Sequence, residues 1–342
     1  MLNVGVPWNT SRPITHWNNV KTRLITYTYN DGTIEETRTE ERVVGFTLSM
    51  IETKESLPDQ IKYLDRLETL SIISNSNSYL YEIELDDVVT KLEYLKSLSL
   101  FGYGISKLPA SMGDMKNLEE LNLSANTFHS LTDIIEPLKK LGPKLKYLNL
   151  ASCRIVDGDA TKNLKDTPNG IDPVSGRRIG LTGTLPKELF TYFPNMEYLN
   201  LSYNYLHGQI PELTEEDFNG EEVLPKLRYL SVNLNRFTGA MPQWMVKHKY
   251  RGCWGATILI FNQEGRDYNG ILAGFNNERE FTNDMPDCPT DEEEEETQLL
   301  NLPILNPEEK AATVEFSAKY PWEKYGNNCP IYGNWRYYNR IK

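Results

Sequence analysis

The chain has 342 residues, 25% of them charged, and its formal net charge is −12 at pH 7. This acidic balance argues against a nucleic-acid-binding surface, which needs clustered Lys and Arg to neutralise phosphate. No stretch approaches the roughly 18–20 consecutive apolar residues of a membrane-spanning helix, so the sequence predicts no transmembrane segment.

The first 42 residues predict a β-hairpin. An alternating segment, R-L-I-T-Y-T-Y at 23–29, is followed by the turn signal Asn30-Asp31-Gly32 and then by T-I-E-E-T-R-T-E-E-R at 33–42. Such a hairpin either covers the end of the structure that follows or extends as a ligand-binding finger. We favour an N-terminal cap over residues 1–42, because the open end of a stacked structure would expose its core to water.

From residue 43 to 264 one apolar pattern, L-x-x-L-x-L, recurs. Its second positions are 23 to 31 residues apart, except for one interval of 51 that holds an insertion. Most intervals are therefore close to the roughly 20–29 residues of a short structural repeat. The seven occurrences, followed by a fainter eighth at Ile258 and Ile260, are Val43/Phe46/Leu48, Leu67/Leu70/Ile72, Leu95/Leu98/Leu100, Leu118/Leu121/Leu123, Leu145/Leu148/Leu150, Met196/Leu199/Leu201 and Leu227/Leu230/Val232.

Each repeat predicts a short strand whose apolar residues, two apart, point to the same side. One coil cannot bury that side alone, whereas stacked coils form a continuous core. A polar residue recurs at the ninth position, where an amide can satisfy backbone groups of the turning chain. We interpret these positions as a structural ladder rather than a binding site: Asn75, Asn126, Cys153, Asn204 and Asn235.

Several coils end in a fixed way. Residues 196–211 read M-E-Y-L-N-L-S-Y-N-Y-L-H-G-Q-I-P, and the ending L-x-G-x-I-P has counterparts at Gly183 to Pro186 and Gly239 to Pro242. Glycine permits the bend and proline stops the strand. This form resembles the plant-type leucine-rich repeat, and the resemblance covers about residues 43 to 264.

The flanks, Trp8 to Trp17 and I-L-I-F-N-Q-E-G at 258–265, resemble those of surface leucine-rich repeat lipoproteins of Bacteroidetes. The resemblance implies an α/β-type repeat fold: a right-handed solenoid of about seven or eight coils, with parallel strands on the concave face, a hairpin N-terminal cap and an irregular C-terminal cap. It also implies an exported protein at the cell surface or outside the cell, often lipid-anchored, whose signal is absent from this chain. A cytoplasmic location is the less favoured alternative.

The insertion at 156–180 is rich in Asp, Asn and Gly. It does not fit a helix-loop-helix calcium site, because Lys162 stands at the glycine position and Pro168 at the bidentate glutamate position. We interpret it as an ordinary polar loop. With Cys153 in the ladder, three cysteines remain, and Cys288 is expected either to pair with Cys253 or Cys329 or to form no bridge.

Residues 265–342 form the third predicted region. The acidic stretch 291–296 is interpreted as a solvated loop. The aromatic tail from Trp322 to Tyr338 is too apolar to stay unfolded, so we expect it to pack as a C-terminal cap, with partner docking as the alternative.

The strand residues between the core leucines predict the concave face. They are nearly uncharged, and in the C-terminal half they are mainly Tyr and Asn. Tyrosine offers a large contact area with few rotatable bonds, and asparagine both donates and accepts hydrogen bonds. The candidate ligand-binding residues are Tyr147, Tyr198, Tyr203, Tyr229, Asn122, Asn149, Asn200, Asn233 and Phe101.

Nothing in the sequence indicates catalysis. The four histidines, His16, His129, His207 and His248, are scattered, and no common catalytic or metal motif is present. We therefore expect a non-enzymatic binding module without cofactor or metal, which recognises a protein partner at the cell surface. The alternatives are a carbohydrate-binding surface lipoprotein and a scaffold subunit of an outer-membrane assembly.

Overall fold

The computed structural model describes residues 11, 13–17, 19–30, 32, 34–51, 55–74, 82–151, 180–202, 204–232, 235–237 and 242–248. Several predicted features lie outside these residues. They are the ladder positions Asn75 and Cys153, the candidate site residues Tyr203 and Asn233, all four cysteines, the insertion apart from Gly180, the eighth coil, the acidic stretch and the aromatic tail.

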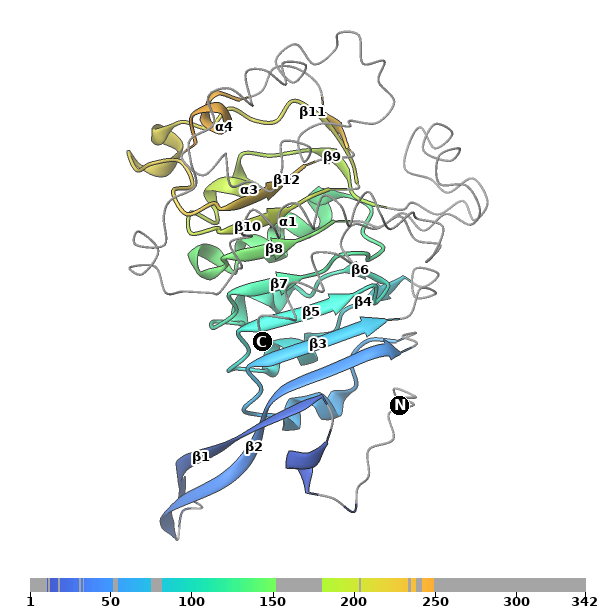
Figure 1. Ribbon diagram of the computed structural model, residues 1–342, viewed down its shortest axis with the longest axis vertical. Helices are drawn as coiled ribbons and strands as arrows, with labels where there is room; N and C mark the ends of the chain where they lie inside the picture. Colours follow the sequence, from blue (N-terminus) through green and yellow to red (C-terminus); the bar gives the residue numbers. More distant parts are fainter. Residues whose placement is uncertain are drawn as a thin grey trace, which may run out of the picture.

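The main feature of the fold is an eight-stranded sheet whose strands stack in chain order (Figure 1). All neighbouring strands are parallel except the first pair, which forms the predicted hairpin. In sheet order the strands are β1 Val20–Asn30, β2 Glu35–Ile51, β3 Thr69–Ser74, β5 Ser97–Phe101, β7 Glu120–Asn122, β8 Tyr147–Asn149, β10 Tyr198–Asn200 and β12 Tyr229–Ser231.

The strand register confirms the alignment of the coils. Two columns of residues run across the sheet on the face opposite the core, which we call the concave face. One column is Gly45, Thr69, Ser97, Glu120, Tyr147, Tyr198 and Tyr229, and the other is Thr47, Ser71, Ser99, Asn122, Asn149, Asn200 and Ser231. The predicted fold class, a solenoid of parallel-strand coils, is confirmed.

The hairpin is joined to the solenoid without a break. Strand β2 pairs antiparallel with β1 through its first part and parallel with β3 from Gly45 onward. The predicted boundary between the N-terminal cap and the solenoid, at residues 42 and 43, therefore falls inside one strand. An extra residue in β2, beside Lys21 and Thr22, shifts the register there. The far part of the hairpin projects past the first coil (Figure 1).

Short helices connect the strands on the other side of the core. Proline precedes several of them, because its fixed φ suits a helix start and it has no N–H to leave unpaired. Pro58, Pro109 and Pro242 are such N-caps. The helices are η1 Ile14–His16 before the hairpin, then η2 Asp59–Tyr63, η4 Asp87–Lys91, η5 Ala110–Asp114, α1 Leu131–Lys139, η6 Gly142–Lys144, α3 Glu188–Thr191, η7 Glu215–Phe218 and α4 Gln243–Lys247.

The L-x-G-x-I-P endings form a second small parallel sheet. Its strands are β9 Thr182–Thr184, β11 Tyr205–Gly208 and β13 Arg236–Phe237. Gly208 has φ of 79°, and a Cβ there would lie 3.0 Å from a methyl group of Thr184. Glycine is therefore needed both for the backbone and for the close approach of the preceding coil. A two-stranded sheet, β4 Ile83–Glu84 with β6 Ile105–Lys107, occupies the N-terminal half.

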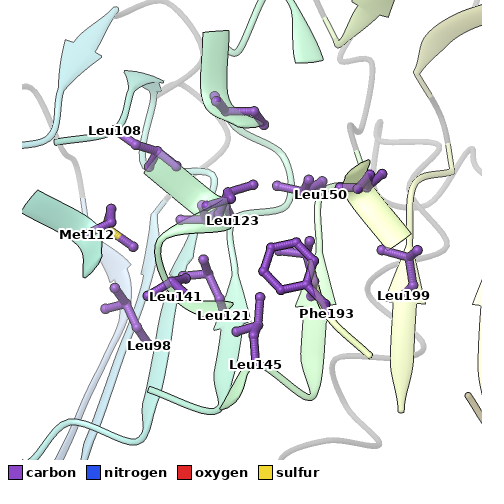
Figure 2. Packing of buried hydrophobic residues seen from close by; sticks show 14 of the residues in the cluster. Leu98, Leu108, Met112, Leu121, Leu123, Leu141, Leu145, Leu150, Phe193 and Leu199 are labelled. Carbon is purple, nitrogen blue, oxygen red and sulfur yellow. The ribbon is translucent and has the colours of Figure 1, made fainter. Parts of the chain in front are cut away.

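The core is one continuous column of leucines between the main sheet and the short helices. Figure 2 shows part of it, with Leu121 from one coil and Leu145 and Leu150 from the next coil near Phe193. Phe193 and Leu145 are completely buried. Each fully buried side chain of this kind contributes roughly 1.5–3 kcal/mol before the loss of chain entropy is subtracted. In the part of the chain that the structure describes, no helix is both long and apolar enough to cross a membrane.

The ninth-position asparagines join adjacent coils. The side chain of Asn204 accepts a hydrogen bond from the Leu181 amide at 2.9 Å and donates to the carbonyls of Leu150 and Leu201, also at 2.9 Å. Asn204 is completely buried, so it provides partners for backbone groups that water cannot reach. Equivalent bonds are made by Asn126 to Ile105 and Leu100, and by Asn235 to Leu206 and Leu201.

Candidate functional site

Three tyrosines form a stack on the concave face. The rings of Tyr147 and Tyr198 have centroids 4.1 Å apart, and those of Tyr198 and Tyr229 are 4.2 Å apart, with planes within 13° of parallel. Tyr147 and Tyr198 are buried, whereas Tyr229 at the C-terminal end is half-buried. We call these three residues the tyrosine stack.

The stack follows from the strand register. Neighbouring strands lie about 4.8 Å apart, and β8, β10 and β12 place a tyrosine at the same position. The rings consequently cover one another, and both faces of the Tyr198 ring are occupied. Burial raises the pKa of Tyr147 and of Tyr198 well above the usual value for tyrosine. Both hydroxyls therefore stay protonated throughout the physiological range. The hydroxyl of Tyr147 accepts a hydrogen bond from Asn149 at 3.5 Å, and that of Tyr198 accepts one from Asn200 at 3.4 Å.

The asparagines beside the stack are engaged within their own strands. The side-chain oxygen of Asn149 accepts the Ala151 amide at 3.1 Å, and that of Asn200 accepts the Ser202 amide at 3.1 Å. Asn122 makes the same bond to Ser124. These asparagines are almost fully buried. The structure thus gives these three asparagines a role in ending the strands that the sequence did not predict. Their role in ligand binding stays a prediction.

Phe101, the remaining candidate, lies apart from the stack. It is 5% exposed and packs with Ile73, Ala125 and Ala151 in a small apolar cluster separate from the main core. Ile73 and Phe101 are paired in the register of β3 and β5. Phe101 is therefore placed among packing residues, and the tyrosine stack is the more distinctive feature of this face.

A column of alternating charge, which was not predicted from the sequence, lies at the edge of the concave face. In six successive coils it is formed by the residue that precedes the column running from Thr69 to Tyr229. From the second member onward, each backbone N–H bonds to the carbonyl of the preceding member. We call these residues the charge column. In chain order they are Glu68, Lys96, Glu119, Lys146, Glu197 and Arg228. The alternation can be read from the aligned sequence, once these positions are compared between coils.

The charge column differs electrostatically between its two ends. At the N-terminal end Glu68 lies 2.5 Å from Arg23 and 3.5 Å from Lys96. Burial works to raise the pKa of Glu68, but the hydrogen bond from Arg23 and the charges of Lys96 and Arg23 lower it below the usual value. At the other end burial raises the pKa of Glu197, although Lys146 and Arg228 oppose the rise.

These opposite shifts predict opposite effects of neutralising the two carboxylates. Glu68→Gln is expected to lower stability at pH 7, by less than about 1 kcal/mol because the pair is exposed, and the loss should shrink as the pH falls through the lowered pKa of Glu68. Glu197→Gln is expected to raise stability at pH 7, because it removes a charge whose burial is unfavourable; that gain should vanish in acid, where Glu197 is protonated. Urea midpoints from about pH 3 to pH 7 measure both effects, because the lower end of this range lies below the usual pKa of a glutamate. A loss of stability at pH 7 in both variants contradicts the assignment for Glu197.

The histidines show no shared site. His129 Nε2 lies 3.2 Å from Glu82, and His248 Nε2 donates to the Leu224 carbonyl at 2.9 Å. His207 is exposed on β11. Among the described residues, no group of three His, Cys, Asp or Glu side chains could hold a metal ion.

Comparisons with known proteins identify the repeat. Residues 195–215 match the family model described as Leucine Rich Repeat. The receptor-like protein CLAVATA2 of Arabidopsis thaliana is 44% identical over 59 residues, which are 17% of this chain and 7% of that protein. The adenylate cyclase of Schizosaccharomyces pombe is 26% identical over 167 residues, 48% of this chain and 9% of that protein. The chain thus matches less than a tenth of the length of each.

Among solved structures, a plant ice-binding protein is similar to this chain with a TM-score of 0.41 and 17% identity, over 72% of this chain and 78% of that one. The match to the repeat model lies on the coil that holds Tyr198, the central member of the tyrosine stack. The resemblance of the flanks to Bacteroidetes surface proteins is not tested by these matches and stays a prediction.

Proposed function

Because the chain is a leucine-rich repeat protein, we propose that it is a non-enzymatic module that recognises a polypeptide on the concave face at the tyrosine stack. Leucine-rich repeat proteins commonly bind other proteins and typically have no enzymatic activity. The observation that carries the proposal is the stack itself, with ring centroids 4.1 and 4.2 Å apart on three successive coils.

A pre-formed stack favours binding for two reasons. Its rings are held by one another and by the strands, so little side-chain freedom is lost when a ligand docks. Its ring edges and hydroxyls offer apolar contact and hydrogen bonding side by side, a combination that suits a polypeptide. The half-buried ring of Tyr229 is the most accessible of the three, and we assign it the central role in contacting the ligand.

The same geometry makes a glycan the weaker candidate. Sugar rings pack on the faces of aromatic side chains, and both faces of Tyr198 are covered by its neighbours. The scaffold alternative, in which partners contact the acidic convex side or the aromatic tail, stays a prediction, and the tail lies outside the described residues. We extend the proposal to the cell surface on the strength of the flanking resemblance alone. Labelling of intact producing cells with a membrane-impermeant reagent tests this location, and absence of labelling on an expressed chain contradicts it.

The binding proposal predicts a specific effect of Tyr229→Ala. Peptides are first selected on the full chain from a phage-displayed random library, and their affinity is measured by titration. We expect Tyr229→Ala to weaken binding by about tenfold or more, as truncation of an interface hot spot does. Tyr63→Ala is the matched control, because Tyr63 is a 73% exposed tyrosine on η2, outside the stack.

Circular dichroism spectra and melting temperatures of both variants establish that each is folded. Unchanged peptide affinity in folded Tyr229→Ala contradicts the proposal, as does equal weakening by Tyr63→Ala. A glycan array probed with the same three proteins tests the weaker candidate. A glycan signal that depends on Tyr229, together with failure to select any peptide, overturns the polypeptide proposal.

A further inference from the structure

Strand β1 is the edge of the main sheet. Within the described part of the chain it has one sheet neighbour, β2, and its other side carries no strand (Figure 1). The strand is 11 residues long, and near its middle Leu24 is 68% exposed. Unpaired backbone groups on a long edge strand are a template for pairing with another strand.

The side chains of β1 are complementary to those of a second β1 running antiparallel. If two copies pair about Ile25, each Lys and Arg of one copy lies opposite a tyrosine of the other, and like charges are never opposite. The direct pairs are Lys21 with Tyr29, Thr22 with Thr28, Arg23 with Tyr27, Leu24 with Thr26, and Ile25 with Ile25. Residues opposite each other in an antiparallel pair share a face and stabilise it through such contacts.

The hairpin already uses this chemistry on its inner side. Across the β1–β2 pairing, the Arg38 guanidinium lies 3.8 Å from the centroid of the Tyr29 ring, and that of Arg42 lies 5.5 Å from the Tyr27 ring. An aromatic ring has two faces, and a cation on the far side is attracted in the same way. Tyr29 can thus take Arg38 from β2 and a cation from a second copy. Tyr27 already has Arg42 at 5.5 Å and Arg66 at 6.0 Å from its ring centroid, so a cation from a second copy would be its third.

We propose that the chain forms a two-fold symmetric homodimer in which the β1 strands of two copies pair antiparallel and join their main sheets. The interface is isologous, because both copies contribute the same residues: if one residue of the first copy contacts a second residue of the other copy, the reverse contact is made as well. Basic residues on an edge strand can instead serve to prevent pairing. The register that pairs Thr22 with Thr28 also places Lys21 opposite Tyr29, and it places Arg23, which holds Glu68 of its own chain at 2.5 Å, opposite Tyr27; this arrangement favours the dimer. This proposal does not depend on the concave-face ligand.

Charge variants on exposed positions of β1 test the dimer. Leu24→Glu/Thr26→Glu places carboxylates of the two copies opposite each other, and Leu24→Lys/Thr26→Lys places two ammonium groups there. Each double variant is expected to raise the dimer dissociation constant by about tenfold or more, because like charges directly opposite destabilise strand pairing. An equimolar mixture of the two variants should restore a dimer, now a heterodimer. The matched control is Thr37→Glu/Thr39→Glu, two exposed threonines on β2.

Sedimentation velocity over a concentration series measures the mass, starting from a 39.4 kDa chain. The proposal expects dimeric wild-type and control proteins, two dissociated double variants, and a dimer in the mixture. It is overturned if the wild-type chain stays monomeric, which would show that the basic residues protect the edge. It is equally overturned if the double variants remain as dimeric as the wild type, or if mixing them restores no dimer.

Discussion

Replacing Asn204 by alanine is expected to lower the free energy of unfolding by about 3–5 kcal/mol, among the largest losses for a single substitution. The change removes the buried hydrogen bonds of this side chain to the Leu181 amide and to the carbonyls of Leu150, Leu201 and Ser202. The Leu181 amide and the Leu150 carbonyl lose this buried partner, and each such loss costs about 1–3 kcal/mol, whereas the Leu201 carbonyl keeps the bond donated by Asn235. Urea-induced unfolding followed by circular dichroism measures the loss.

Asn117→Ala is the matched control for Asn204. Asn117 is an exposed asparagine whose side chain donates one bond to the Glu93 carbonyl. We expect a change within about 0.5–1 kcal/mol for this variant, because water replaces the lost bond. A loss for Asn204→Ala that is no larger than this would contradict the view that the ninth-position amides hold neighbouring coils together.

Phe193→Ala is expected to cost a similar amount, about 3–5 kcal/mol. The ring is completely buried and lies among leucines of successive coils (Figure 2). Its removal takes away apolar contact and leaves a cavity that a stacked structure, held on both sides by neighbouring coils, cannot easily close. The loss is measured in the same urea experiment.

Phe193→Leu separates the two parts of this effect. Leucine fills much of the cavity, so a cost well below that of alanine is expected. Tyr63→Ala, which removes a 73% exposed ring, serves as the control and should change stability by less than about 0.5 kcal/mol. Equal costs for the alanine and leucine variants would show that the site relaxes, contrary to a rigidly packed core.

The strand register was predictable from the sequence because every coil repeats the same L-x-x-L-x-L spacing within its strand, although the coils differ in length. Once Leu70, Leu98 and Leu121 were aligned, each residue between them was assigned to a column, and the backbone pairing follows those columns. The hairpin was predictable for a related reason, since Asn30-Asp31-Gly32 separates two alternating segments. In both cases the information lies in a short segment of the sequence, either within one coil or around one turn.

The roles of the concave side chains were less predictable. An asparagine on an exposed strand and one that ends its own strand have the same sequence position, so Asn149 and Asn200 could not be distinguished from ligand-binding residues. The contact between Tyr147 and Tyr198 depends on two strands that an insertion separates in the sequence. The charge column could have been found, but it required comparing charges, not only apolar residues, across the coils.

The most direct test of the binding proposal is the position of a bound peptide on the solenoid. A photoreactive benzoylphenylalanine is placed at Tyr229, on the stack, and separately at Tyr63, on η2, and each protein is irradiated with a library-selected peptide. We predict cross-linking from position 229 and none from position 63. Retained peptide binding with cross-linking only from position 63, or from neither position, would contradict recognition at the tyrosine stack.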